Sequence, residues 1–241
     1  MIDKTVAIVT GASRGIGRAI ALKFARQGMA VALTARHEKN LKAVAKEIVS
    51  GGGFDPMIIS ADLRDLTNIA QISQQVMEKW GRIDILVNNA GLGYLKPFPE
   101  ITAAEFQEMF DVNVRAVFFL TQQVLPVMVQ RNSGMIINIA SLAAKNGFKL
   151  GTGYAATKWA LRGFAQCLLQ EVREHDIRVI TIFPGSVDTS FGAGQQSPAG
   201  IRSKNKILPE DIAEAAYFAY TIPPRSLLSE IDIRPTNPTK T

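Results

Sequence analysis

Three side chains whose types suit proton transfer stand close together in the sequence. Tyr154 and Lys158 are four residues apart, so on a helix they lie on one face, and Ser141 precedes them. A phenol with a pKa of about 10 donates a proton poorly at neutral pH unless a cation lowers that pKa, and Lys158 would supply the cation. The serine hydroxyl can hold the oxygen that gains or loses the proton. The set indicates proton transfer at a carbonyl or alcohol oxygen, which also needs a hydride carrier such as a nicotinamide. Alone, the pair also fits a solvated helix face.

The bulk composition fits one soluble globular domain. The chain has 241 residues, of which 47% are hydrophobic and 20% charged, and both values are ordinary. We expect a single domain over residues 1–241 in the cytoplasm. No signal-peptide pattern and no apolar run of about 18 residues is found, so no membrane partner is expected. The single cysteine, Cys167, excludes an intrachain disulfide, and its apolar neighbours predict that it is buried.

The net charge of +6 raises the question of nucleic-acid binding. The basic residues are scattered along the chain, and no zinc-finger spacing or aromatic RNA-binding motif accompanies them. We therefore predict no nucleic-acid partner. His37 and His175 also lack metal-ligand spacing, so no metal site is predicted. A basic surface does suit an anionic ligand such as a dinucleotide phosphate.

Short apolar runs alternate with amphipathic stretches along the whole chain. The runs predict buried strands at 6–10, 30–35, 57–60, 85–88, 135–140, 179–183 and 231–233. The amphipathic stretches predict helices at 16–27, 39–49, 66–79, 103–129, 153–174 and 209–220. Within 103–129, Pro126 predicts a kink or break, and 111–113 a second irregularity. Strand–helix alternation predicts an α/β fold of Rossmann type: a doubly wound, seven-stranded parallel sheet flanked by helices on both faces.

The turn between the first expected strand and helix has the glycine pattern of a phosphate-binding loop. It reads Thr10-Gly-Ala-Ser-Arg-Gly-Ile-Gly17. Gly11 allows the tight turn, Gly15 lets the backbone approach a pyrophosphate, and Gly17 allows the helix to pack closely on the strand. A glycine-rich turn without a ligand is the alternative, but the βαβ context favours a dinucleotide.

The end of the second strand indicates which dinucleotide is bound. NAD-binding folds usually place an acidic residue there to accept from the ribose 2′-hydroxyl. Here the strand ends in Ala35 and Arg36, with no carboxylate before Glu38. A guanidinium pairs well with a 2′-phosphate, and Arg14 can reach the same region. We therefore predict NADP(H), although Arg36 could also be a solvated strand-end residue.

The glycine spacing, together with Ser141, Tyr154 and Lys158, resembles the short-chain dehydrogenase/reductase family in its compact, single-domain form. The resemblance covers residues 5–235. It implies cofactor contacts by Gly11, Ser13, Arg14, Gly15, Ile16, Gly17, Arg36, Asp62, Leu63, Asn89, Ala90, Gly91, Tyr154, Lys158, Pro184, Gly185, Val187 and Thr189. Of these, Asn89 can instead be structural, Asp62 a helix cap and Thr189 an ordinary loop residue.

The resemblance also implies catalytic roles for four residues. Tyr154 would donate the proton in reduction or accept it in oxidation. Lys158 would bond the nicotinamide ribose and, with the positive ring of the cofactor, lower the tyrosine pKa. Ser141 would hydrogen-bond the substrate oxygen, and Asn113 would hold a water in a proton path to Lys158.

We expect an NADP(H)-dependent oxidoreductase that interconverts a small-molecule carbonyl and a secondary alcohol, acting as a carbonyl reductase. Residues 189–208 should cover the substrate, and the resemblance implies a homodimer or homotetramer. The Arg234-Pro-Thr ending is similar to that of sepiapterin-reductase-type members, and the Gly-Gly turn of 3-oxoacyl-thioester reductases is missing. Those two reductases remain alternatives, as does a non-catalytic dinucleotide-binding regulatory protein.

Overall fold

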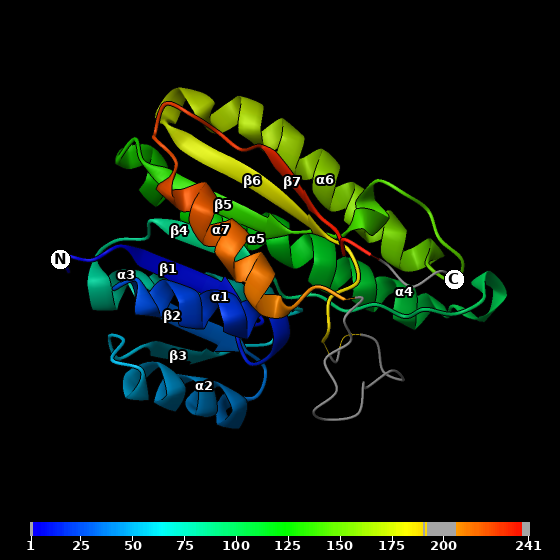
Figure 1. Cartoon of the computed structure of the whole chain (residues 1–241), viewed down its shortest axis with the longest axis horizontal. Helices are drawn as coiled ribbons and strands as arrows, with labels where there is room; N and C mark the ends of the chain where they lie inside the picture. The colour runs from blue at the N-terminus through cyan, green and yellow to red at the C-terminus, as the bar shows by residue number, and fades with distance from the viewer. Residues whose placement is uncertain (1, 190, 192–205, 238–241) are drawn as a thin grey trace.

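The computed structural model describes residues 2–189, 191 and 206–237. In this part of the chain seven parallel strands form one sheet in the order β3-β2-β1-β4-β5-β6-β7 (Figure 1). The strands are β1 (Val6–Thr10), β2 (Ala30–Ala35), β3 (Met57–Ser60), β4 (Ile85–Asn88), β5 (Gly134–Ile139), β6 (Ile177–Pro184) and β7 (Glu230–Ile233). The order reverses between β1 and β4, and such a switch point is where open α/β sheets bind ligands. The predicted doubly wound fold is confirmed.

Helices cover both faces of the sheet. They are α1 (Gly15–Arg26), α2 (Glu38–Ser50), α3 (Leu66–Trp80), α4 (Ala103–Phe110), α5 (Ala116–Gln130), α6 (Thr152–Val172) and α7 (Pro209–Thr221). Short 3-10 turns lie at η1 (Phe98–Glu100), η3 (Leu142–Ala144) and η4 (Arg173–His175), and η2 (Asp111–Arg115) is a π-helix. In Figure 1, α1, α2 and α7 lie in front of the sheet, and α3, α5 and α6 lie behind it.

Alternation along each strand produces two separate cores. Successive side chains of β1 point to opposite faces: Ala7 and Val9 pack with α1, α2 and α7, whereas Val6 and Ile8 pack with α3, α5 and α6. All of these side chains are fully buried. Burial on both faces explains why the strands have continuous apolar runs rather than an alternating pattern.

The long predicted helix at 103–129 differs from expectation in one respect. Pro126 lies inside α5 without ending it, since the helix runs from Ala116 to Gln130. Of the predicted kink or break at Pro126, the break is excluded, because packing of the apolar face of α5 holds the helix together across the missing hydrogen bond. The second predicted irregularity is confirmed, because the π-helix η2 joins α4 to α5.

Two further points concern apolar surface. By length and composition only, Ala103–Gln130 could cross a membrane, but the core helix of a soluble protein passes the same test, and one face of α5 packs in the core described above. Cys167 is exposed, so its predicted burial is wrong. On α6 the buried positions are taken by Leu161, Ala165 and Leu168, which lie on the face opposite to the thiol.

Candidate active site

The structure brings Ser141, Tyr154 and Lys158 together at the carboxyl end of β5. Ser141 caps the 3-10 turn η3, where its Oγ accepts a hydrogen bond from Ala143 N at 3.1 Å. Tyr154 and Lys158 both lie on α6 and are only 9% and 4% exposed. Ser141 lies close enough to Tyr154 for its hydroxyl to act on the phenol and lower its pKa. A buried phenol with a serine partner and an ammonium one turn away is therefore in place.

Burial dominates the titration of this pair. It raises the pKa of Tyr154 to about 12, against which the Ser141 hydrogen bond acts only weakly. It also lowers the pKa of Lys158 to about 8. Lys158 Nζ donates to Ile139 O at 3.0 Å and lies 5.7 Å from the centre of the Tyr154 ring. In the protein without its cofactor, desolvation thus outweighs a cation at that distance. The expectation that Lys158 lowers the phenol pKa together with the positive ring of the cofactor stays a prediction.

Asn113 lies in the π-helix η2 and is buried. Its Oδ1 accepts from Leu92 N at 2.9 Å, while its Nδ2 donates to Leu92 O at 2.8 Å and to Thr157 Oγ1 at 2.9 Å. These bonds tie the segment after β4 to α6. Across the gap left by Gly91, a Cβ would lie 3.2 Å from Asn113 Oδ1 and 3.7 Å from Lys158 Nζ. Asn113 and Lys158 therefore border the same small polar space.

The glycine loop has the geometry that its sequence predicts. Gly11 and Gly15 have φ of +64° and +55°, a conformation that favours glycine. A Cβ on Gly17 would lie 2.3 Å from Asn89 Nδ2 and 2.4 Å from Gly11 O, so only glycine fits there. The first turn of α1 carries no acidic residue, which leaves its N-terminus suited to an anion.

The loop is fastened to the segment after β4 by two residues. Asn89 Nδ2 donates to Thr10 O at 2.8 Å and to Gly11 O at 3.3 Å. Thr10 Oγ1 accepts from Asn89 N at 2.9 Å and Ala90 N at 3.0 Å, and donates to Val87 O at 3.1 Å. These contacts support the structural role considered for Asn89. Thr10 could not be assigned this role from the sequence, because its partners lie nearly 80 residues away.

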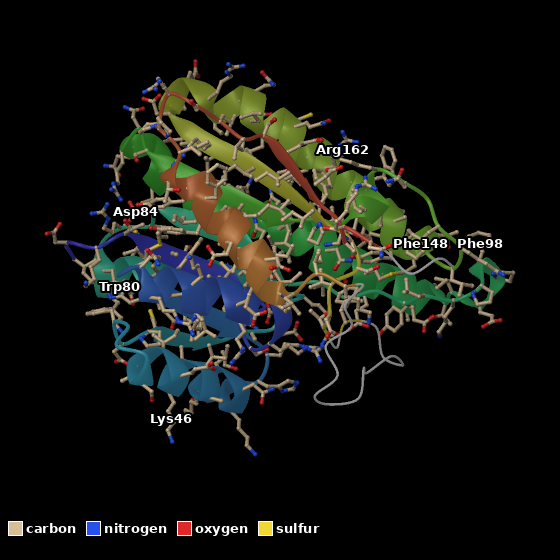
Figure 2. The ribbon with its side chains drawn as sticks, viewed as in Figure 1. Lys46, Trp80, Asp84, Phe98, Phe148 and Arg162 are labelled. Carbon is tan, nitrogen blue, oxygen red and sulfur yellow. The ribbon has the colours of Figure 1, made fainter. Side chains whose placement is uncertain are left out.

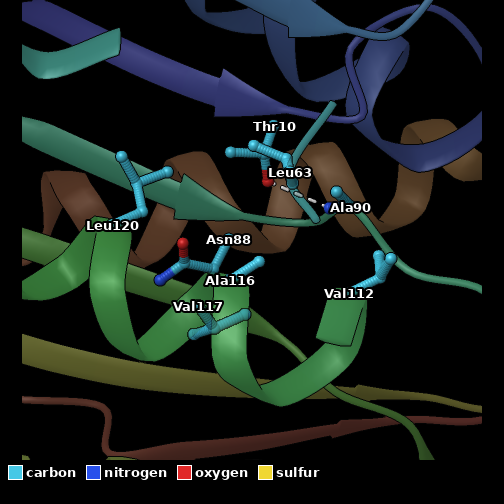
Figure 3. Close-up of a pocket in the computed structure, with 8 residues that line it drawn as sticks. All are labelled: Thr10, Leu63, Asn88, Ala90, Val112, Ala116, Val117 and Leu120. Atoms are coloured by element: carbon cyan, nitrogen blue, oxygen red, sulfur yellow. Dashed lines mark hydrogen bonds between the residues drawn. The ribbon is translucent and has the colours of Figure 1, made fainter. Parts of the chain in front are cut away.

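A shallow indentation, without enclosed room for a water molecule, lies beside these bonds (Figure 3). Figure 3 shows it between the carboxyl ends of β1 and β4 and the first turns of α5. Its lining residues are Thr10, Leu63, Asn88, Ala90, Val112, Ala116, Val117 and Leu120. Two of the predicted cofactor residues, Leu63 and Ala90, line it. Asn88 is buried and donates to Thr121 Oγ1 at 3.2 Å and Asn138 Oδ1 at 3.0 Å, so it stabilises the sheet.

The strand ends on the other side of the loop carry the residues predicted for the adenosine end. Arg36 is exposed just beyond β2, and its charge reaches Asp62 beyond β3. Asp62 is paired with Arg64, with Nη2 to Oδ2 at 2.6 Å, and this hydrogen bond holds the pKa of Asp62 below its usual value. Arg64 was not singled out from the sequence; its second partner, Glu108 at 2.9 Å, lies 44 positions away. Ser13 and Arg14 lie in the glycine loop, where Arg14 is exposed.

The turn after β6 meets the glycine loop. Gly185 N donates to Ile233 O of β7 at 2.8 Å, and Val187 forms a bridge with Ile207. A Cβ on Gly15 would lie 3.4 Å from Cγ2 of Thr189, so Thr189 stands over the loop. Of the predicted substrate-covering loop at 189–208, residues 190 and 192–205 lie outside the described residues. Pro184 ends β6 and is buried.

Apolar side chains surround the phenol. Met109, Ala143 and Ala155 pack in one cluster with Tyr154, and Leu92, Tyr94 and Ile101 pack against it. The Phe191 ring lies 5.6 Å from the ring of Tyr154. Phe191 was not singled out from the sequence, because only its contact with Tyr154 distinguishes it. In the described ranges, which omit 190 and 192–205, no group of three metal-ligand side chains is found.

Comparison with known proteins gives one consistent family. The model of the short chain dehydrogenase family matches residues 5–199. An uncharacterised oxidoreductase of Staphylococcus saprophyticus is 37% identical over 97% of this chain and 98% of its own length. A sepiapterin reductase of Chlorobaculum tepidum is 32% identical over 97% of each chain. The structure of an alcohol dehydrogenase from the archaeon Thermococcus sibiricus, complexed with 5-hydroxy-NADP, has a TM-score of 0.90 and 32% identity over 98% of this chain and 99% of that one. Other matching structures also hold NADP.

Proposed function

Because the chain belongs to the short-chain dehydrogenase family, we propose that it is an NADP(H)-dependent carbonyl reductase that interconverts a carbonyl and a secondary alcohol. The observation that carries the proposal is the buried phenol of Tyr154, with Ser141 beside it and Lys158 on the same helix. The glycine loop at the switch point of the sheet stands beside this pair and supports cofactor binding.

Side chains of the protein can donate the proton that the reaction needs. When bound, NADPH supplies the hydride that adds to the carbonyl carbon. Tyr154 donates its phenolic proton to the carbonyl oxygen, and its raised pKa keeps it protonated at neutral pH. Ser141 Oγ accepts the Ala143 N–H, and its own hydrogen, which otherwise faces the phenol, would turn to the substrate oxygen when substrate binds.

The proton that leaves Tyr154 must be replaced in each turnover. Lys158 lies beside the phenol, and its pKa of about 8 lets it exchange a proton near neutral pH. The polar space bordered by Asn113 and Lys158 offers room for a water between them because residue 91 is glycine. These contacts support Lys158 as the replenishing group and Asn113 as a residue that orders the path.

Charge at the strand ends supports NADP(H) as the cofactor. Arg36 stands where NAD-dependent relatives of this fold place an acid, and Arg14 stands in the glycine loop. Both guanidinium groups would pair with a 2′-phosphate, whereas a carboxylate would repel it. Solved structures of similar proteins hold NADP or its 5-hydroxy derivative. The observed cradle of Gly11, Gly15 and Gly17 fits the pyrophosphate of that cofactor.

The surroundings of the phenol favour a carbonyl with apolar or aromatic groups next to it. Phe191, Leu92 and Ala143 form apolar walls around Tyr154. A sepiapterin-type reductase is the narrower candidate, favoured by the 32% identity to the sepiapterin reductase of Chlorobaculum tepidum. An aromatic pterin ring would suit those walls.

We also propose that residues 1–241 form a single domain, and that the protein is a homodimer or homotetramer in the cytoplasm. The single continuous sheet supports one domain. Phe118 on α5 and Trp159 on α6 are 46% and 49% exposed, more than large apolar side chains usually are. Pairing of these helices between subunits would cover them, and light scattering after gel filtration would measure the assembly.

The test of the function is turnover of the purified protein. The rates of NADPH and NADH oxidation are compared, with diketones, ketoesters, quinones, pterins and acyl thioesters in turn as the substrate. We expect NADPH oxidation with at least one class and slower oxidation of NADH. A preference for NADH would contradict the cofactor assignment. NADPH binding without turnover on any class would instead support a non-catalytic dinucleotide-binding protein.

A further inference from the structure

A cluster of charged side chains lies on the side of the site away from the cofactor loop. Lys145 Nζ contacts Glu230 Oε2 at 2.8 Å and Asp232 Oδ1 at 2.6 Å. Arg162 donates to Glu230 from Nε at 2.8 Å and from Nη2 at 3.1 Å. These four residues are called the Glu230 cluster below. Its side chains are only 20–33% exposed, so solvent screens them less than an ordinary surface pair.

The Glu230 cluster joins three elements that carry the catalytic residues or lie beside them. Lys145 is the C-cap residue of the 3-10 turn η3, and Ser141 is its N-cap residue. Arg162 lies on α6, one turn beyond Lys158. Glu230 begins the edge strand β7, and Figure 2 shows Arg162 on α6 near this edge of the sheet. A single carboxylate thus holds both the serine segment and the tyrosine helix.

An aromatic ring lies beneath the two cations. Lys145 Nζ is 4.0 Å and the Arg162 guanidinium 5.7 Å from the centre of the fully buried Phe183 ring. Cation–π contacts of this kind fix the two side chains in one place. Gln166 also donates to Glu230 Oε1 at 3.0 Å, and Arg234 lies 3.3 Å from Asp232. Every carboxylate of the cluster therefore has a cationic or amide partner.

The surroundings of Glu230 favour its ionised form. Burial by itself would raise the pKa of Glu230, but the hydrogen bonds from Arg162 and Lys145 outweigh it and lower the pKa to about 2. Glu230 is therefore ionised over the whole working range of pH. The cluster acts as a constant clamp and not as a switch.

Building on the proposed function, we propose that Glu230 is a positioning residue that, through Lys145 and Arg162, holds Ser141 against Tyr154. The hydroxyl of Ser141 acts on the phenol only through a hydrogen bond, which depends steeply on distance and angle. Ser141 and Tyr154 belong to different elements, which pack together through Ala143, and a charged group that contacts both elements would fix their alignment further. Glu230 is such a group.

The proposal has a consequence that a purely structural role lacks. The Ser141 hydrogen bond lowers the pKa of Tyr154, against the larger effect of burial. Loosening η3 relative to α6 weakens that bond, and the phenol then ionises at higher pH. In alcohol oxidation Tyr154 must be deprotonated, so the acid limb of the activity profile moves to higher pH.

The test compares Glu230→Gln with the wild type in both reaction directions. Glutamine keeps the shape of the side chain but removes the charge that binds Lys145 and Arg162. We expect kcat to fall about tenfold, the NADPH dissociation constant to stay within about twofold, and the acid limb to move up by about half a pH unit. Glu214→Gln is the matched control: it removes the exposed Lys23–Glu214 pair between α1 and α7 and should leave all three values unchanged.

Two further variants separate the outcomes. Lys145→Gln keeps the Arg162–Glu230 pair, so it should fold even if Glu230→Gln does not. Like Glu230→Gln, it should lower kcat and move the acid limb to higher pH. Lys145→Arg should restore most of the activity. Unchanged kcat and acid limb in a less stable Glu230→Gln protein would overturn the proposal, as would loss of folded protein in both neutral variants. Absence of NADPH-dependent turnover in the wild type would instead refute the proposed function.

Discussion

The ring of Tyr154 leaves no room for a side chain at Gly93. A Cβ on Gly93 would lie 2.8 Å from Cδ2 and 3.3 Å from Cγ of Tyr154, closer than carbon atoms approach without displacement. Gly93 follows the segment that Asn113 ties to α6, so this backbone and the phenol are held against each other. The position of the proposed proton donor therefore depends on a glycine that carries no functional group.

Gly93→Ala should therefore lower kcat about tenfold to a hundredfold by displacing the phenol a few tenths of an ångström or more. The NADPH dissociation constant should change much less than kcat, because the nearest atoms to the new methyl group are those of the Tyr154 ring. Steady-state kinetics and NADPH fluorescence titration measure the two values. Gly163→Ala on the same helix as Tyr154 is the control: its Cβ meets nothing within 4 Å. It should keep kcat and stabilise the protein by about 0.5–1 kcal/mol. Equal kcat in both variants would contradict the packing argument.

Tyr154→Phe should keep NADPH affinity and lower kcat by about 10²–10⁴-fold, since general acid catalysis contributes that much. The phenyl ring retains the apolar contacts with Met109 and Phe191, so the fold should survive. Single-turnover measurement of NADPH oxidation, together with a binding titration, tests this. Near-wild-type turnover would rule out Tyr154 as the proton donor.

Much of the fold follows from the sequence, because the signals that specify it are local. Apolar runs locate the seven strands within a few residues, and the glycine spacing locates the turn after β1. The irregularity at 111–113 was also visible locally, since Asp and Asn there interrupt an apolar helix. Pro126 does not break α5, because tertiary packing of the helix outweighs a local penalty.

The parts of the site that sequence could not supply depend on contacts between distant residues. Arg162 and Glu230 are 68 positions apart, and Thr10 meets Asn89 across 79 positions. Neither pairing has a spacing rule from which it could be read. The pKa of Tyr154 shows the same limit: the spacing to Lys158 was right, but the burial that raises the pKa appears only once the chain is folded.

Arg36→Glu should change the cofactor preference. A carboxylate at the end of β2 would repel the 2′-phosphate of NADPH and could accept from the ribose hydroxyl of NADH. We expect the KM for NADPH to rise about a hundredfold, equivalent to about 3 kcal/mol, while that for NADH falls. Lys46→Glu makes the same charge change on the outer face of α2, where Figure 2 shows the side chain pointing away from the protein, and should alter neither value. A similar rise in the KM for NADPH in both variants would show that the effect comes from net charge alone.

The Glu230 cluster also predicts how stability depends on pH. The folded-state pKa of Glu230, about 2, lies below the ordinary value of 4.5, so its ionisation stabilises the folded state above about pH 4.5. That contribution, on the order of 2 kcal/mol after allowing for solvent screening, is lost as the pH falls towards 2. Urea unfolding at pH 6, 4 and 3 should show the wild type most stable relative to Glu230→Gln at pH 6, with the gap narrowing as the pH falls. Glu214→Gln should differ from the wild type by less than about 1 kcal/mol throughout, because its pair with Lys23 is exposed on the carboxylate side. A gap for Glu230→Gln that stays constant from pH 6 to pH 3 would show that the carboxylate charge does not stabilise the fold.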